Sequence, residues 1–408
     1  MKKIITNVIA ALVCSASMNA QQGDSVASTS YRPFQASFIS PMGTNGLESA
    51  KYTNNVSFNI VAGYAGGLRG FELGSFSNLI LNDAEGVQVA GFCNTVLGKT
   101  RGTQVCGFSN VTRKTMKGAQ VAGFANVVSD SATVVQVSGF SNVVNGSNTG
   151  SQLTGFANVT KGSADGAQIA GFSNYAHDDS KTVQIAGFSN MVKGNLTGAQ
   201  VSGFSNNVAG DVTGVQLAGF INTAKKVNGT QIGFINICDT IEDGVAIGFL
   251  SIVKKGYRSL EVGTDESLPA QVNFKIGTTR FYNIFSGGVK PKSNDINWGF
   301  GYGLGSMISL SPKMNLNMDA ICYQIYYNNI WIEDYSFLNK LRITASYRLT
   351  EKISVYVGPT FNVYVSNRVD SEGNLTSQSI APWTSFDKAR YNSVVQMYPG
   401  FTAGIKIN

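Results

Sequence analysis

The residues best suited to chemistry surround the only histidine of the chain. His177 is followed by Asp178 and Asp179, and an imidazole beside two carboxylates can bind a divalent metal ion. These residues lie in the polar stretch "YAHDDSK", where a lone histidine is more often simply solvated. One histidine also offers little for a Ser-His-Asp or Cys-His nucleophile. We therefore expect no metal site and no catalytic residue here.

Two other patterns match functional motifs only in part. The stretch "GFGYGLG" at 299–305 has the glycines of a nucleotide loop, but no helix is expected after it and its aromatics alternate as in a barrel strand. Carboxylates such as Asp165 and Asp211 do not recur at one position, whereas a carbohydrate-cleaving β-helix needs acidic residues clustered on neighbouring coils. The sequence thus predicts no enzyme and no cofactor, with a carbohydrate-active β-helix as an alternative.

The cysteines beyond residue 20 invite a disulfide interpretation, because an exported chain with an even number of them commonly pairs them. Cys93 follows its repeat phenylalanine by one residue, while Cys106 precedes its own by two. In strands, these offsets place the two side chains on opposite faces. We therefore expect free thiols at all four positions, which are Cys93, Cys106, Cys238 and Cys322.

The strongest pattern is an internal repeat. Ten phenylalanines fall sixteen residues apart from Phe76 to Phe220, and looser copies follow at Phe234 and Phe249. Around nine of them the core reads Gln-(Val/Ile/Leu)-x-Gly-Phe-x-Asn, which indicates a repeat architecture made of strands. The residues that define its structural columns include Gln88, Gln104, Gln120 and Gln136, Phe92, Phe108, Phe124 and Phe140, and Asn94, Asn110, Asn126 and Asn142.

Two β arrangements can produce this period. In a solenoid each repeat forms one coil and identical residues stack about 4.8 Å apart; in a barrel each repeat forms one strand and one turn. A single inserted residue would throw a coil out of register, so the nine unbroken steps favour the solenoid. We expect the Gln and Asn amides to bond along the axis, the phenylalanines to supply the apolar core, and the Gly before each Phe to mark a bend. Barrel strands remain the alternative.

The segments that flank the repeat look different. After Tyr257, eight stretches of 9–15 residues alternate in polarity and are rich in aromatics, as in "EKISVYVGPTFNVYV", which is typical of an outer-membrane-type β-barrel. Upstream, "FQASFIS" and "NNVSFNIVAGYAGG" have the same character, so we expect them to pair with those strands and help close the barrel. A soluble β-sandwich that caps the solenoid is the alternative.

The N-terminus reads as an export signal. "MKKIITNVIAALVCSASMNAQQ" has two lysines, an apolar run and small residues up to Ala20, after which we expect cleavage. The fold class is all-β, and the expected division is 1–20 signal peptide, 21–68 N-terminal β strands, 69–256 repeat β-solenoid and 257–408 antiparallel β-barrel-like domain. The net charge of +7 is spread without a dense basic run, so nucleic-acid binding has little support.

The repeat units, such as "GAQVAGFAN", resemble those of the GFxN-type surface-repeat proteins of Bacteroides-like bacteria, and "NNVSFNIVAGYAGGLRGFELG" and "RFYNIFSGG" are similar to the segments that bracket such arrays. The resemblance implies export to the outer membrane or surface of a Gram-negative bacterium, and no catalytic residues.

We therefore expect a non-enzymatic envelope protein with a structural or adhesive role. Its partners would be outer-membrane lipid and a glycan or protein ligand. A transport barrel in which the repeats are strands is the main alternative. The oligomeric state does not follow from the sequence.

Overall fold

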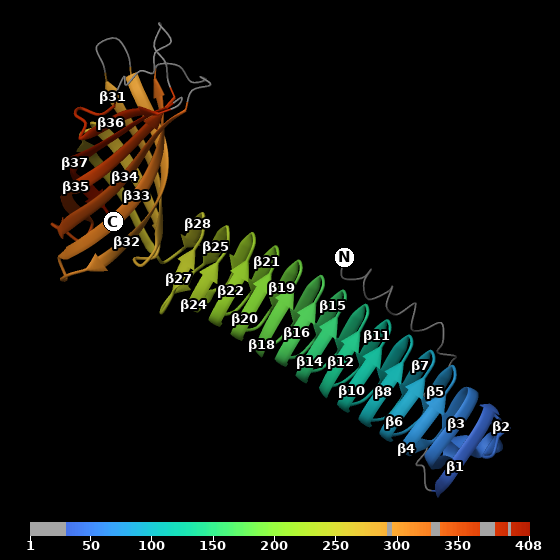
Figure 1. Cartoon of the computed structure of the whole chain (residues 1–408). Coiled ribbons are helices and arrows are strands. Elements are labelled where there is room, and N and C mark those ends of the chain that lie inside the picture. Colours follow the sequence, from blue (N-terminus) through green and yellow to red (C-terminus); the bar gives the residue numbers. More distant parts are fainter. Residues whose placement is uncertain (1–29, 292–295, 328–334, 368–379, 391–392) are drawn as a thin grey trace. The chain divides into compact units, whose positions relative to one another are not determined.

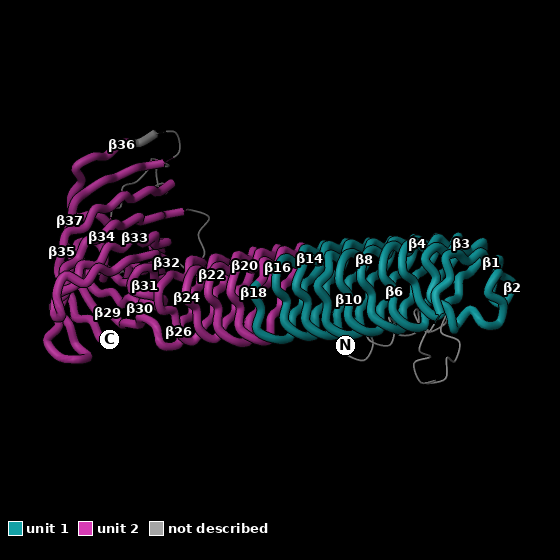
Figure 2. Tube along the Cα trace, turned by 90° about the horizontal axis from the view of Figure 1, so that it is seen from below, with its two compact units in different colours: residues 1–181 teal, residues 182–408 magenta. Residues whose placement is uncertain are grey.

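The computed structural model describes residues 30–291, 296–327, 335–367, 380–390 and 393–408, so the predicted signal peptide lies outside the described residues. These residues form a parallel β-solenoid of about 13 turns with a period near sixteen residues, and a closed antiparallel barrel of eight strands (Figure 1). The all-β prediction is confirmed, and the alternative in which each repeat is a barrel strand is wrong. The chain divides into two compact units, 1–181 and 182–408 (Figure 2).

Each coil consists of a long strand and a short strand, and each strand pairs in parallel with its counterpart in the next coil. Gln104 lies opposite Gln120, and Asn110 lies opposite Asn126, so the register advances by one sixteen-residue repeat. In residues 1–181 the long strands are β4 (Gly67–Gly74), β6 (Ala84–Ala90), β8 (Thr100–Cys106), β10 (Met116–Ala122), β12 (Ala132–Ser138), β14 (Asn148–Thr154) and β16 (Ala164–Ala170). The short strands are β5 (Ser77–Ile80), β7 (Cys93–Val96), β9 (Ser109–Thr112), β11 (Ala125–Val128), β13 (Ser141–Val144), β15 (Ala157–Thr160) and β17 (Ser173–Ala176).

The N-terminal strands belong to the solenoid, and the prediction that they help close the barrel is wrong. Strand β1 (Ser30–Ile39) pairs in parallel with β3 (Tyr52–Ala65), which pairs in turn with β4 and β5. The short β2 (Met42–Gly43) and the 3-10 helix η1 (Gly46–Lys51) connect β1 to β3. The physical reason lies in their inward side chains, because Gln35, Asn54 and Asn59 are buried amides like those of the repeat.

The bend between the strands of a coil explains the glycine before each phenylalanine. Gly107 and Phe108 lie between β8 and β9, and a Cβ at Gly107 would come within 2.2 Å of the carbonyl oxygen of Gly91 in the preceding coil. Only glycine allows this approach, so the predicted bend is confirmed. The bend also interrupts the alternation of the strands, which turns the phenylalanine side chain outward.

The prediction that phenylalanine forms the solenoid core is therefore wrong. The interior of each coil is narrow and holds the Gln and Asn side chains, the small residue two positions after Gln, and an aliphatic residue such as Val96 or Val128, both fully buried. The phenylalanines are instead 38–54% exposed at most coils, including Phe76, Phe140 and Phe156. A ring at that position has no interior space to occupy.

Residues 182–408 contain the remaining coils and the barrel. Their coil strands are β18 (Ser180–Ala186), β19 (Ser189–Val192), β20 (Leu196–Ser202), β21 (Ser205–Val208), β22 (Val212–Ala218), β23 (Ile221–Thr223), β24 (Lys226–Ile232), β25 (Ile235–Cys238), β26 (Thr240–Ile241), β27 (Val245–Ile247) and β28 (Leu250–Val253). The barrel strands are β29 (Tyr257–Asp265), β30 (Ala270–Gly277), β31 (Tyr282–Pro291), β32 (Ile296–Ser309), β33 (Met314–Tyr327), β34 (Ser336–Arg348), β35 (Ile353–Ser366) and β37 (Ser393–Ile407). Strand β37 pairs with β29 to close the barrel, and β36 (Phe386–Arg390) adds to one end of β37.

The last coil ends on the barrel wall. Asn283 of β31 is fully buried; its Oδ1 accepts a hydrogen bond of 2.8 Å from the backbone N–H of Ser251, and its Nδ2 donates one of 2.8 Å to the carbonyl of Gly248. The ring of Tyr302 stacks on Phe249 at 4.6 Å, in line with the repeat phenylalanines. The barrel thus supplies the cap that a solenoid end requires.

We predict that Asn126→Ala destabilises the solenoid by about 2–6 kcal/mol, because it leaves the buried amides of Asn110 and Asn142 each short of one partner. The measurement is urea unfolding followed by far-UV circular dichroism. Asn145→Ala removes an exposed amide and should change stability by less than about 0.5 kcal/mol. Equal effects of the two substitutions would contradict the proposed role of the buried amides.

Candidate functional site

The predicted Gln and Asn columns form two hydrogen-bonded ladders inside the solenoid. In residues 1–181 the Nε2 of each column glutamine from Gln104 to Gln168 donates to the Gln Oε1 of the preceding coil at 2.8–2.9 Å. Each Asn Nδ2 donates to the Asn Oδ1 of the following coil at 2.9–3.1 Å. The structure thus aligns all eight predicted amide residues, and each is at most 1% exposed.

The Asn ladder is also tied to the backbone. Asn110 Nδ2 donates to the carbonyl of Val121 at 2.8 Å in addition to its bond with Asn126, and its Oδ1 accepts from Asn94. Because both hydrogens and the acceptor are used, the buried side chain escapes the cost of an unpaired polar group. The Asn ladder from Asn94 to Asn158 therefore acts as a structural element whose amide groups are already used.

Glu72 lies at the start of the Gln ladder. Its Oε2 accepts a hydrogen bond of 2.9 Å from Gln88 Nε2, and its Oε1 accepts one of 3.2 Å from Asn59 Nδ2. Burial raises the pKa of this carboxyl to about 7, against the opposing effect of those hydrogen bonds. Because Gln88 directs its Nε2 at this carboxyl, its Oε1 is left to accept from Gln104, and each later glutamine donates in the same direction.

The phenylalanines form a third column on the outside. From Phe76 to Phe172 the ring centroids lie 4.7–4.9 Å apart and the ring planes differ by only 2–3°. Aliphatic side chains next to the Gln column are also exposed; Val121 is 41% and Leu153 is 47% exposed. The solenoid therefore presents an aromatic and aliphatic strip to its surroundings.

The barrel interior is polar and charged. Lys275 Nζ lies 2.7 Å from Glu261 Oε1 and 2.9 Å from Asp319 Oδ2, and Arg342 contacts both carboxylates at 2.7 Å. A second ion pair joins Lys340 to Asp265. The side chains of all six residues are at most 1% exposed. These pairs, together with buried tyrosines such as Tyr282 and Tyr323, fill the lumen, as expected for eight strands.

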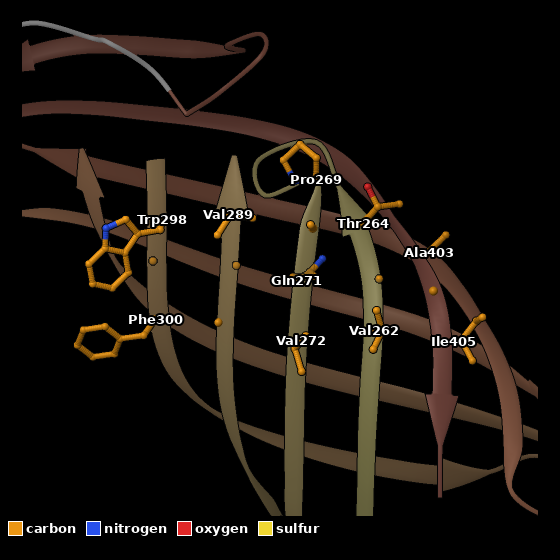
Figure 3. A pocket seen from close by; sticks show the side chains of 16 residues that line it. Val262, Thr264, Pro269, Gln271, Val272, Val289, Trp298, Phe300, Ala403 and Ile405 are labelled. Carbon is orange, nitrogen blue, oxygen red and sulfur yellow. The ribbon is translucent and has the colours of Figure 1, made fainter. Parts of the chain in front are cut away.

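The barrel exterior is apolar. Exposed side chains along the strands include Leu260, Val262, Val272, Phe274, Phe285, Val289, Phe300, Leu304, Met318, Leu341, Ile343, Val355, Val357, Phe361, Phe401 and Ile405. Figure 3 shows part of this wall, where Val262, Val272 and Phe300 line a hollow of about 870 Å³. The barrel thus reverses the usual distribution of a water-soluble protein, with ionised groups inside and hydrocarbon outside.

The other candidate residues do not form a site. His177 Nδ1 lies 2.8 Å from Asp178 Oδ1 on the exposed surface, and the described residues contain no group of three or more potential metal ligands. All four cysteines are free thiols, and burial raises the pKa of Cys106 and of Cys238 to about 12. Residues 299–305 lie in β32, so the glycines serve the barrel wall.

Comparison with protein-family models, curated proteins and solved structures gives no match for this chain. Among the described residues, no helix has the length and apolar character needed to cross a bilayer.

Sequence reasoning missed two sets of residues. Glu72 occupies the Gln position of the irregular copy "ELGSFSN", so extending the repeat frame by one step would have found it. The charged residues of the lumen alternate with apolar residues along each strand, as Glu261 does between Leu260 and Val262. Because alternate side chains point to the same face of a strand, this pattern could have predicted that they point inward.

We predict that Glu72 makes solenoid stability depend on pH. Its folded pKa of about 7 exceeds the ordinary value of 4.5, so its contribution is complete below pH 4.5 and is lost as pH rises through 7, by about 3 kcal/mol. Urea unfolding between pH 4 and pH 8 should show this loss in the natural chain and not in Glu72→Gln. The exposed carboxyl of Glu85 serves as control, because Glu85→Gln should keep the pH dependence.

We predict that Lys340→Met destabilises the barrel by about 3–5 kcal/mol, because Asp265 keeps a buried charge without its partner. Unfolding of the detergent-solubilised protein, followed by tryptophan fluorescence, measures the effect. Leu341→Met alters the adjacent outward position and should change stability by less than about 1 kcal/mol. A Lys340→Met variant as stable as the control would show that the ion pair is dispensable.

Proposed function

We propose that the barrel anchors this chain in the outer membrane of a Gram-negative bacterium, and that the solenoid is an exported, non-enzymatic structural or adhesive element. The main observation behind the proposal is the distribution of side chains in the barrel. Its outward positions are apolar, while Lys275, Lys340 and Arg342 are buried in ion pairs. Water would disfavour such a wall, whereas lipid hydrocarbon matches it.

Aromatic residues at one end of the barrel support the same proposal. Trp298 stacks on Tyr326 at 4.5 Å, and Tyr335 lies beside Phe337 with ring centroids 5.9 Å apart. These residues stand where β32 and β34 begin and β33 ends. Outer-membrane barrels carry such aromatic side chains at the membrane–water interface. The apolar leader at residues 4–13 is in keeping with export.

A transport role has less support. The lumen of the eight-stranded barrel is filled by ion pairs and buried tyrosines, and the repeats contribute no strand to it. A channel would require this packed interior to open. The proposal therefore includes lipid as a partner of the barrel and no substrate of its lumen.

The test is protease shaving of intact cells that carry an epitope tag in the exposed turn at Asn145, followed by fractionation. The expected result is cleavage at the tag while the C-terminal barrel stays in the outer-membrane fraction. Full protection with membrane retention would place the solenoid on the periplasmic side. Recovery of the whole chain in the soluble periplasm would overturn the anchor, and stable conductance of the purified protein in planar bilayers would revive the channel.

A further inference from the structure

The exposed strip of the solenoid is larger than a monomer normally shows to water. In residues 76–172 it consists of the seven stacked phenylalanines and the exposed aliphatic residues Val87, Val105, Val121, Val135, Leu153 and Ile169. Phe76, Phe140, Phe156 and Phe172 are 38–54% exposed, and Phe92, Phe108 and Phe124 are less exposed. A phenylalanine has roughly 200 Å² of surface, so the seven rings and the exposed aliphatic residues together offer roughly 900 Å². Monomers rarely expose more than a few hundred Å² of contiguous apolar surface.

We propose that this strip is a self-association surface, on which a second copy of the same chain packs. Its area reaches the roughly 800 Å² per partner that a stable protein–protein interface buries. This proposal concerns the solenoid and does not depend on the barrel being a membrane anchor.

The geometry of the strip favours a second copy over a sugar ligand. Because neighbouring rings lie 4.7–4.9 Å apart and almost parallel, their faces cover one another and only their edges are exposed. Carbohydrates stack on aromatic faces, which this column does not offer. A partner must instead present side chains at the same spacing as the coils along the whole strip. Another copy of this solenoid has the same coil spacing, because its sequence is identical.

The border of the strip does not oppose such pairing. Glu85 lies between Arg69 and Arg101, with N–O distances of 3.8 and 3.6 Å, so one carboxylate contacts both guanidinium groups. Lys117 lies opposite Arg101 in the next coil. The repeat cores themselves carry no charged residue from Gln88 to Asn174. Two copies therefore meet through apolar side chains, and the row beside the strip holds only a few charges of both signs, which include Glu85, Arg101, Lys117 and Asp165.

The test uses two full-length copies with different tags, expressed in the same cells and purified through one tag after detergent extraction. We expect the second tag to be recovered with the first, and its recovery to fall at least tenfold in the Val121→Lys/Leu153→Lys variant, which puts two charges on the strip. Ser129→Lys/Asn145→Lys adds the same charge at exposed turn positions and should retain full recovery.

Both pairs of substitutions occupy exposed positions, so far-UV circular dichroism should show the same β content for all forms. If the second tag is not recovered with the first in the natural chain, the proposal is overturned. This holds whether or not lipid or a different protein is recovered with the first tag. Recovery that survives Val121→Lys/Leu153→Lys overturns it as well, because association would then use another surface such as the barrel.

Discussion

The requirement that a buried amide find hydrogen-bond partners governs the solenoid. Gln120 and Asn126 are fully buried, and each bonds to the same kind of amide one coil away. This condition sets where the inward positions fall, because each amide must face an amide of the next coil. Asn126 and Asn142 are 16 residues apart, whereas the bonded pairs Asn59–Asn78 and Asn222–Asn236 are 19 and 14 apart. The same condition also makes both ends special. Glu72 accepts from the first glutamine, while Ser251 and the barrel residue Asn283 continue the asparagine column.

In both the solenoid and the barrel, side chains along a strand alternate between the interior and the exterior, but the inward polar groups differ. In a coil, alternate residues bury amides that bond to themselves along the axis, and the remaining positions expose valine and phenylalanine. In the barrel, alternate residues bury ionised groups that neutralise one another, while the outward positions expose hydrocarbon. In both parts the ladder amides or the ion-paired residues are buried, and apolar side chains face outward. That apolar surface is therefore the place to look for partners, which we propose to be lipid at the barrel and a second copy at the solenoid.

Much of the architecture could be predicted because period and parity are visible in the sequence. The unbroken sixteen-residue steps predicted a parallel coil with stacked amides, and the alternation after Tyr257 predicted the barrel. The position of Phe108 could not be predicted by parity, because the bend at Gly107 lies between it and Gln104 and breaks the alternation. The pairing of β1 and β3 depended on three buried amides, Gln35, Asn54 and Asn59, whose spacing departs from the repeat. The lumen ion pairs join residues distant in sequence, as Lys275 and Asp319 are, and only the closed barrel brings them together.

The two amide ladders run in opposite directions. Gln120 donates backward along the chain to Gln104, whereas Asn126 donates forward to Asn142. Their dipoles therefore oppose each other within every coil, and no macroscopic polarity accumulates as coils are added. A gene that duplicated or lost one whole repeat would encode a longer or shorter solenoid with the same Glu72 start and the same barrel cap. Length can thus vary during evolution in steps of a complete coil. The bonded pairs Asn59–Asn78, Gln216–Gln231 and Asn222–Asn236 are 19, 15 and 14 residues apart, so coils of other lengths also keep their amides paired.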